Sequence, residues 1–225
     1  MSLAVAYTRA KLGINAPLVS IEVHLSNGLP GFHMVGLPET AVKESKDRVR
    51  SAIINSHFEF PARRITVNLA PADLPKEGSR FDIAIAIAIL AASDQLPREH
   101  LKDYEFIGEL ALSGETRPVD AVLPAALGCV SHNKQLIIAR DNAPEAGLVS
   151  DLSILPAKHL LEISAHLHQR QLLQPWDKQA TAEADNHPLN SKPDKELSEV
   201  IGQHQAKRAL EISATGGHNL LFYGP

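Results

Sequence analysis

The last residues of the chain form the segment whose residue types and spacing come closest to a nucleotide-binding motif. Asn219 to Tyr223 are predicted to form a buried strand, and Gly224 follows directly. A phosphate-binding loop has the form G-x-x-x-x-G-K-[ST] between a strand and a helix. Its backbone N–H groups wrap the phosphates, and its lysine neutralises them. Only the first glycine of that form is present here. Alone, this is a weak signal, because strands that end in Gly-Pro are common.

The other reactive side chains show no metal-binding or disulfide pattern. None of the 11 histidines forms an H-x-x-x-H or Cys-His pattern with supporting neighbours, so we predict no metal site. The single cysteine, Cys129, lies in an apolar segment and is predicted to be a small buried residue. One cysteine excludes a disulfide framework and fits a reducing cytoplasm.

Neither a membrane span nor a signal peptide is predicted. The longest apolar run, residues 83–92, has 10 residues, whereas a membrane-spanning helix needs about 20. The N-terminus has no basic segment ahead of its apolar residues. We therefore expect a cytoplasmic protein without a membrane partner.

The charge of the chain argues against a domain that grips nucleic acid by itself. The net charge is −4, whereas such a domain would be basic. Residues 39–64 are the exception, with six basic residues against four acidic ones. We favour a solvated helix face over a phosphate-binding track for this segment. The chain alone should bind DNA weakly at physiological salt, since it can neutralise few phosphates.

Hydrophobic periodicity predicts a mixed domain over about the first 170 residues. In 17–25 polar and apolar residues alternate, as in a half-buried strand, and 38–56 is amphipathic, with Pro38 suited to the first turn of a helix. The predicted elements are strands 2–10, 17–25 and 31–36, helix 38–56, strand 64–69, helix 79–93, strands 104–112 and 116–119, helix 123–132, strand 135–139, helix 143–148, strand 152–155 and helix 157–168.

Segment 79–93 is ambiguous from its pattern. Isoleucine and alanine alternate over 83–89, as in a strand, but alanine is the best helix former and the run is long for a strand. Ser79 with Asp82 three residues later resembles a capping box, with Ser79 as the N-cap. We predict a buried helix.

The composition changes after about residue 172. Residues 174–193 are polar and small, contain three prolines and are predicted to be an interdomain linker. A helix is predicted over 203–215, ended by Gly216-Gly217. We therefore divide the chain into a domain at 1–172, a linker at 173–193 and the start of a second domain at 194–225.

The segment 199-EVIGQHQAKRALEISATGGHNLLFYGP-225 resembles the opening of a magnesium-chelatase-like AAA+ module. The first 170 residues resemble the N-terminal domain of the ComM-type (YifB-like) family in 28-GLPGFHMVGLPETAVKESKDRVRSAI-53, 65-ITVNLAPADLPKEGSRFDIAIAIAIL-90 and 107-IGELALSGETRPVDAVLPAALG-128. The resemblance implies an α+β fold of the ribosomal S5 domain 2-like (Lon protease-like) type. The first elements of an AAA+ α/β domain would follow it and stop before the phosphate loop is complete.

The resemblance also implies a site and a function. Val200 and Ile201 would line the adenine pocket, and Gly224 and Pro225 would begin the phosphate loop. The full-length protein would be a homohexameric ATPase that uses ATP and Mg²⁺. It would act as a helicase or branch-migration motor on single-stranded or branched DNA, in natural transformation and recombination. We assign no catalytic residue to this chain and expect it to have no bound cofactor and no activity by itself.

The similarity to Lon proteases raises an alternative, a Lon-type ATP-dependent protease component with a degenerate Ser–Lys site. In Lon-type sequences the serine follows P-K-D-G-P, and 75-PKEGSRFD-82 aligns with that stretch without a gap. Arg80 then takes the serine position, and Ser79 lies one residue early. The lysine position, aligned through 108-GEL-110 and Pro118, is held by Leu123. Because leucine cannot act as a base, we expect no peptidase activity.

Overall fold

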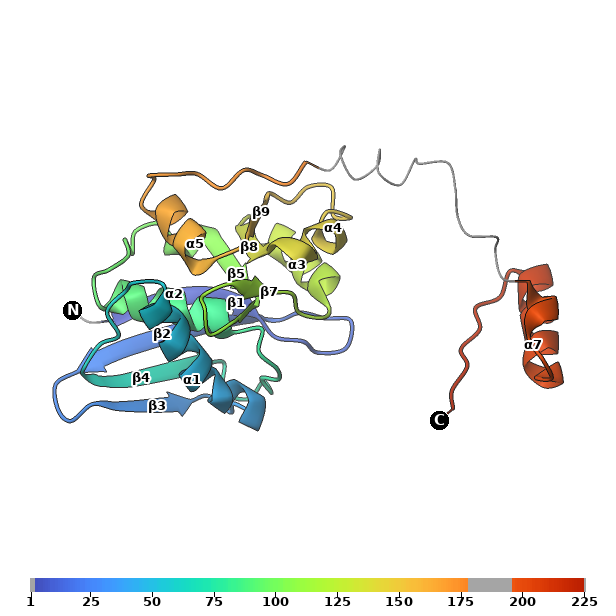
Figure 1. Cartoon of the computed structure of the whole chain (residues 1–225), viewed down its shortest axis with the longest axis horizontal. Coiled ribbons are helices and arrows are strands. Elements are labelled where there is room, and N and C mark those ends of the chain that lie inside the picture. Colours follow the sequence, from blue (N-terminus) through green and yellow to red (C-terminus); the bar gives the residue numbers. More distant parts are fainter. Residues whose placement is uncertain (1–2, 178–195, 225) are drawn as a thin grey trace. The chain divides into compact units, whose positions relative to one another are not determined.

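The computed structural model describes residues 3–177 and 196–224, and the chain divides into two compact units, 1–181 and 182–225 (Figure 1). The predicted linker falls mostly on residues outside the described ones. The domain boundaries proposed from the sequence stay predictions.

The first unit begins with a four-stranded sheet in the order β1-β2-β4-β3 (Figure 1). Strand β3 pairs parallel with β4, and the other pairs are antiparallel. Each of β1, β2 and β4 buries alternate side chains, as the period of two predicted. The four strands are β1 (Leu3–Arg9), β2 (Leu18–Ser26), β3 (Gly31–Val35) and β4 (Arg64–Ala70).

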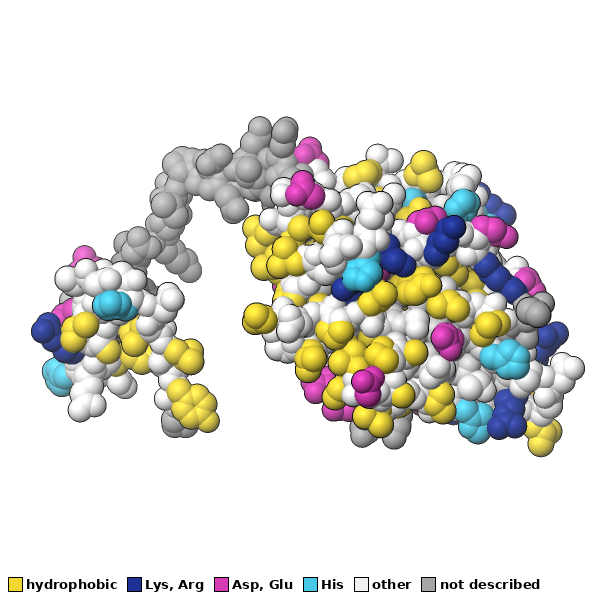
Figure 2. All heavy atoms as spheres, turned by 180° about the vertical axis from the view of Figure 1, so that it is seen from behind, with side chains coloured by type: hydrophobic (Ala, Val, Ile, Leu, Met, Phe, Trp, Pro, Cys, Tyr) yellow, Lys and Arg dark blue, Asp and Glu magenta, His cyan; other side chains and the backbone are white. Residues whose placement is uncertain are grey.

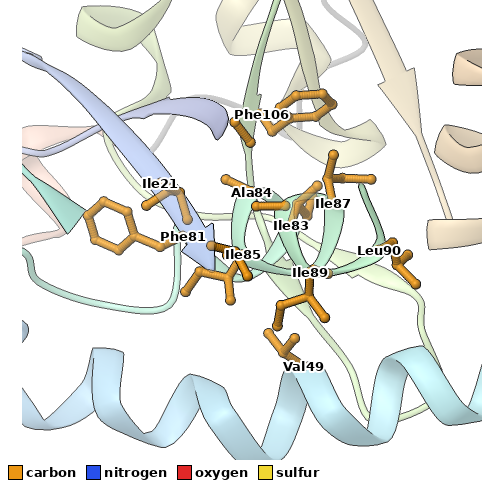
Figure 3. Packing of buried hydrophobic residues seen from close by; sticks show 14 of the residues in the cluster. Ile21, Val49, Phe81, Ile83, Ala84, Ile85, Ile87, Ile89, Leu90 and Phe106 are labelled. Carbon is orange, nitrogen blue, oxygen red and sulfur yellow. The ribbon is translucent and has the colours of Figure 1, made fainter. Parts of the chain in front are cut away.

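Helix α2 (Asp82–Ala92) is the centre of the unit, and each of its 11 residues is buried. It packs on β1, β2, helix α1 (Thr40–Asn55) and strand β5 (Tyr104–Ile107). Figure 3 shows Val49 of α1 on one side of α2 and Phe106 of β5 on the other. The helix predicted at this ambiguous segment is confirmed, and alanine's high helix propensity explains the outcome.

A second, parallel sheet follows in the order β5-β8-β9, together with a two-stranded hairpin of β6 and β7. Its core contains the buried Cys129, as predicted. The remaining elements are η1 (Leu101–Asp103), β6 (Glu109–Leu110), β7 (Thr116–Arg117), α3 (Val122–Val130), β8 (Gln135–Ala139), η2 (Arg140–Asn142), α4 (Ala143–Ala146), β9 (Ile154–Ala157) and α5 (Leu160–Leu167). The first unit is thus a mixed α/β domain with several sheets.

A buried ion pair joins the two sheets. Arg9 at the end of β1 donates from Nε and Nη2 to both carboxylate oxygens of Glu105 in β5, at 2.6 and 2.9 Å. Both side chains are almost completely buried. Such a two-pronged contact fixes the orientation of the two side chains as well as their distance. It therefore fixes the position of β1 relative to β5.

The residues after α5 cross the edge strand of the second sheet. The backbone N–H of Trp176 donates to the carbonyl of Ile154 in β9 at 2.8 Å. The indole packs against the second core, close to Gly147 at the end of α4. Trp176 therefore pairs with part of an otherwise open strand edge.

A strand and a helix start predicted in the first unit are wrong. Predicted strand 104–112 is split into β5 and β6, because Gly108 between them has φ +151° and breaks the regular strand path. Pro38 precedes α1, whose N-cap is Glu39, and Pro38 instead forms a bridge with Lys76.

The second unit contains η3 (Leu197–Glu199) and helix α7 (His204–Gly216). Gly217 ends α7 in the left-handed conformation, at φ 63°, as predicted. The predicted buried strand 219–223 is wrong: these residues form no strand and are exposed. A strand needs hydrogen-bonding partners along its edge, and residues 196–224 contain no other strand to provide them.

Candidate functional site

A cavity of about 390 Å³ lies in the first unit, where the chain enters α2 and α3. It occupies the region in which the similarity to Lon proteases predicted a degenerate dyad. Its lining residues are Lys11, Glu77, Gly78, Ser79, Arg80, Glu109, Pro118, Val119 and Asp120.

Arg80 is the buried cation of this cavity, with 4% of its surface exposed. Its Nη2 donates to the carbonyl of Ala121 at 3.4 Å, and its buried Nε has no acceptor among the described residues. Burial lowers the pKa of Arg80, while Asp120 and Glu145 nearby raise it. The guanidinium group is thus held in place with few of its hydrogen bonds made.

Gly108 fixes the backbone of Arg80 against the second sheet. The N–H of Gly108 donates to the carbonyl of Arg80 at 3.1 Å, and Ile83 donates back to the carbonyl of Gly108 at 3.3 Å. A Cβ at Gly108 would lie 2.6 Å from Cδ1 of Ile83. The φ of +151° at this position favours glycine, and a side chain there would also have to displace Ile83.

The N-terminus of α3 forms another part of the site. Ala121, its N-cap, is left-handed at φ 55°. Glu145 Oε1 accepts from the N–H groups of Val122 and Leu123 at 3.0 and 2.9 Å. A carboxylate from α4 therefore satisfies the first free N–H groups of α3.

The two positions aligned with the Lon dyad lie on segments that contact each other. Arg80 contacts Ala121, two residues before Leu123, and Leu123 packs on the second core. Neither a nucleophile nor a base stands at the two positions. Alignment alone indicated the residue types, and the structure adds that Arg80 contacts the backbone two residues before Leu123.

Ser79 has no base available in this geometry. Its hydroxyl forms no hydrogen bond among the described residues, although Lys11 lines the same cavity. Lys76, three residues earlier, is fully buried, and its Nζ donates to the carbonyl of Pro71. Burial lowers the pKa of Lys76. Its amine is bonded to the Pro71 carbonyl and not to the Ser79 hydroxyl.

The capping role predicted for Ser79 is wrong. The N-cap of α2 is Phe81, and Ser79 contributes only its carbonyl, which accepts from the N–H of Asp82 at 3.1 Å. Asp82 is instead a buried hub that accepts hydrogen bonds from Ser45, Arg48 and the N–H of Leu110. Burial raises the pKa of Asp82, and its bonds to Arg48 and Ser45 lower it.

The predicted nucleotide-binding residues lie in the second unit. Val200 is 42% exposed and Ile201 is 96% exposed. Gly224 is exposed as well, and Pro225 lies outside the described residues. These 225 residues contain no lysine and Ser/Thr after Gly224 that could bind phosphate and magnesium. The nucleotide-binding roles of Val200, Ile201, Gly224 and Pro225 therefore stay predictions.

A search of residues 3–177 and 196–224 finds no group of three or more His, Cys, Asp and Glu placed to hold a metal ion. Within the same residues, no helix has the length and apolar character needed to cross a membrane.

Two family models match separate parts of the chain. Residues 21–142 match the family described as subunit ChlI of Mg-chelatase, and residues 196–225 match the family magnesium chelatase, subunit ChlI. The chain is 56% identical to the competence protein ComM of Haemophilus influenzae and 52% identical to the uncharacterized protein YifB of Escherichia coli. Both matches cover 100% of this chain, but only 44% and 43% of the relatives.

A weaker match links the chain to a Lon protease of Rhizobium meliloti, at 27% identity over 166 residues, or 68% of this chain and 20% of that protein. Fold and site thus define a mixed α/β protein with a distant similarity to Lon proteases. The chain belongs to the Mg-chelatase subunit ChlI-like family, within which it is similar to ComM and YifB along its whole length. It spans less than half the length of these curated relatives.

Proposed function

We propose that this chain is the N-terminal accessory part of a ComM-type, ATP-dependent DNA motor that acts in the cytoplasm during natural transformation and recombination. The full-length protein would form a homohexamer, use ATP and Mg²⁺, and act on single-stranded or branched DNA. The 56% identity to a competence protein over the whole chain supports the process. The chelatase-like match at 196–225 supports the motor.

The observation that carries the accessory role is the contact of Arg80 with Ala121 at the start of α3. Because Arg80 and Leu123 occupy the two dyad positions, the first unit supplies a binding surface without peptidase chemistry. We propose the ribosomal S5 domain 2-like fold for this unit, and the 27% identity to a Lon protease supports it.

We also propose that this chain does not bind DNA tightly by itself. In the basic segment 39–64, Arg48 is bonded to Asp82, and Arg50 lies over the ring of Phe60 at 4.9 Å. On the face in Figure 2, lysine and arginine side chains are interspersed with acidic and apolar ones. Few phosphates can therefore be neutralised together, and we expect weak binding at physiological salt.

The test is branch migration of a synthetic four-way DNA junction by the full-length protein that contains this chain. We expect product only with hydrolysable ATP and Mg²⁺, and none with a non-hydrolysable analogue. The 225-residue chain alone should hydrolyse no ATP. ATP hydrolysis by the full-length protein without junction movement or DNA stimulation would contradict the proposal, as would nanomolar DNA binding by the chain alone at physiological salt.

A further inference from the structure

The Arg80 cavity, defined by the nine lining residues given above, has a charge pattern that the proposed motor does not use. Arg80 lies in its wall, and Lys11 is the other cation. Three acidic side chains, those of Glu77, Glu109 and Asp120, share the same lining. We propose that this cavity binds a small zwitterion of the amino-acid type. Its carboxylate would contact Arg80, and its ammonium group would face the acidic side chains.

The need for a carboxylate follows from the state of Arg80. Its surface is 4% exposed, its Nε has no acceptor within residues 3–177 and 196–224, and its Nη2 has one carbonyl at 3.4 Å. In the described part of the chain, no carboxylate lies within ion-pair distance of it. A buried cation without a charged partner is costly, so a ligand anion at the terminal nitrogens of Arg80 would complete the site.

The nearby acidic groups do not replace such a ligand. Glu145 is bonded to the N–H groups of Val122 and Leu123. Asp120 acts on Arg80 only through space. The guanidinium group therefore keeps donors for an incoming carboxylate, which it can bind in a planar, two-pronged manner.

The need for a cation on the same ligand follows from the rim. Glu77 and Asp120 are exposed, and Glu109 has Arg117 at 3.6 Å. The lining carries three acidic and two basic side chains, and Arg117 pairs with one of the acids, so charges of both signs face the cavity without a large excess of either. A volume of about 390 Å³ falls in the lower range of small-molecule sites, about 300–1,000 Å³. A compact ligand of no net charge fits these conditions.

Titration of the isotopically labelled 225-residue chain tests the proposal by NMR. The probes are glycine, 4-aminobutanoate and 6-aminohexanoate, with acetate, butylamine and inorganic phosphate as controls that carry charge of one sign. The backbone amides of Gly78, Arg80 and Val119 report binding. At least one zwitterion should saturate these shifts with a Kd on the order of tenfold or more below those of acetate and butylamine.

Variants assign the binding to the cavity. Arg80→Met keeps the apolar stem and removes the charge, and it should weaken the best zwitterion by on the order of tenfold or more. Glu77→Gln and Glu109→Gln should weaken it too. Glu115→Gln, an exposed change outside the lining, should leave it unchanged. If Arg80→Met does not fold, the two glutamine variants decide.

Several results would overturn the inference. One is the absence of saturable shifts with all three zwitterions. Another is that acetate or phosphate binds as tightly as the best zwitterion. The third is that the lining variants bind the zwitterion as tightly as the wild-type chain. Because the readout involves neither ATP nor DNA, failure here leaves the proposed motor function untouched, and failure of the motor assay leaves this site standing.

Discussion

Arg48 Nε donates to Asp82 Oδ2 at 2.8 Å, and this bond joins the middle of α1 to the first residue of α2. The Asp82 side chain is fully buried, and that of Arg48 is 23% exposed. Ser45 on the same helix and the N–H of Leu110 in β6 also donate hydrogen bonds to this carboxylate. One carboxyl group thus ties together α1, α2 and the β6–β7 hairpin, next to the Arg80 cavity.

Replacing Arg48 by methionine should destabilise the chain by roughly 3–5 kcal/mol near neutral pH, because it leaves Asp82 buried and unpaired. The pKa of Asp82 is raised in the folded state, so the unfolding free energy falls as pH rises from the unfolded to the folded pKa. Arg48 lowers this pKa, so its loss extends that window upward. Urea unfolding at about pH 5 and about pH 7.5 should show the larger deficit at the higher pH.

Two further variants control this experiment. Lys46→Met, an exposed change on the same helix, should cost little at either pH. Arg48→Met with Asp82→Asn should recover part of the loss, since the buried group is then neutral. A deficit for Arg48→Met that is identical at both pH values would contradict the role given to Asp82.

Gly108→Ala should destabilise the chain by about 2–4 kcal/mol, because alanine is strained at φ +151° and its Cβ would overlap with Ile83 Cδ1. Ile83→Val removes that atom and alone should cost about 0.5–1.5 kcal/mol. In the Gly108→Ala background, Ile83→Val should cost less than this or be favourable. A double-mutant cycle from urea unfolding measures the difference. Strictly additive losses would rule out the steric contact as the cause.

Gly147→Ala should displace Trp176, because the added Cβ would lie 3.0 Å from both Trp176 Nε1 and the carbonyl oxygen of Ala143. The chain has one tryptophan, so its fluorescence reports this position alone. We expect emission to shift to longer wavelength, with a small loss of stability. Leu148→Ala, at a neighbouring side chain that is 74% exposed, is the matched control and should leave the emission unchanged. Unchanged emission in Gly147→Ala would show that Trp176 does not depend on this contact.

The purified chain should cleave protein and peptide substrates no faster than buffer does, and Ser79→Ala should give the same result. Ser79 has no base in hydrogen-bonding contact, and Lys76 is bonded to the carbonyl of Pro71. The measurement is release of fluorescent peptide from a labelled unstructured substrate. Cleavage that Ser79→Ala abolishes would restore the Lon-type protease alternative.

The order of elements in the first unit could be predicted from the sequence, because strand periodicity and alanine content are local signals. The role of Asp82 could not, because its side-chain partners lie 34 and 37 residues away in the chain. A local capping rule therefore assigned Ser79 and Asp82 to each other. Strand 219–223 failed for a related reason: its apolar residues indicate a buried strand only where a neighbouring strand exists.

The candidate site was predictable in its residue types but not in its form. Alignment placed Arg80 and Leu123 at the two dyad positions, but periodicity carries no sign of a cavity. Glu77 comes from the loop before α2, Asp120 from the loop before α3 and Glu109 from β6. The sequence showed Gly108 only as one residue of the segment 107–128 that resembles the family. Its close approach to Ile83 could not be predicted, because it depends on how β5 packs against α2.

Helix α2 has no side that faces water. Its amide protons can therefore exchange with solvent only when much of the unit opens, and the helix should belong to the most slowly exchanging part of the chain. Arg80 and Asp82 lie at the N-terminal end of this helix. The wall of the Arg80 cavity next to α2 therefore cannot move unless the core opens. A ligand in the cavity would contact the part of the domain whose amide protons exchange most slowly. Its binding would slow the amide exchange of α2 further.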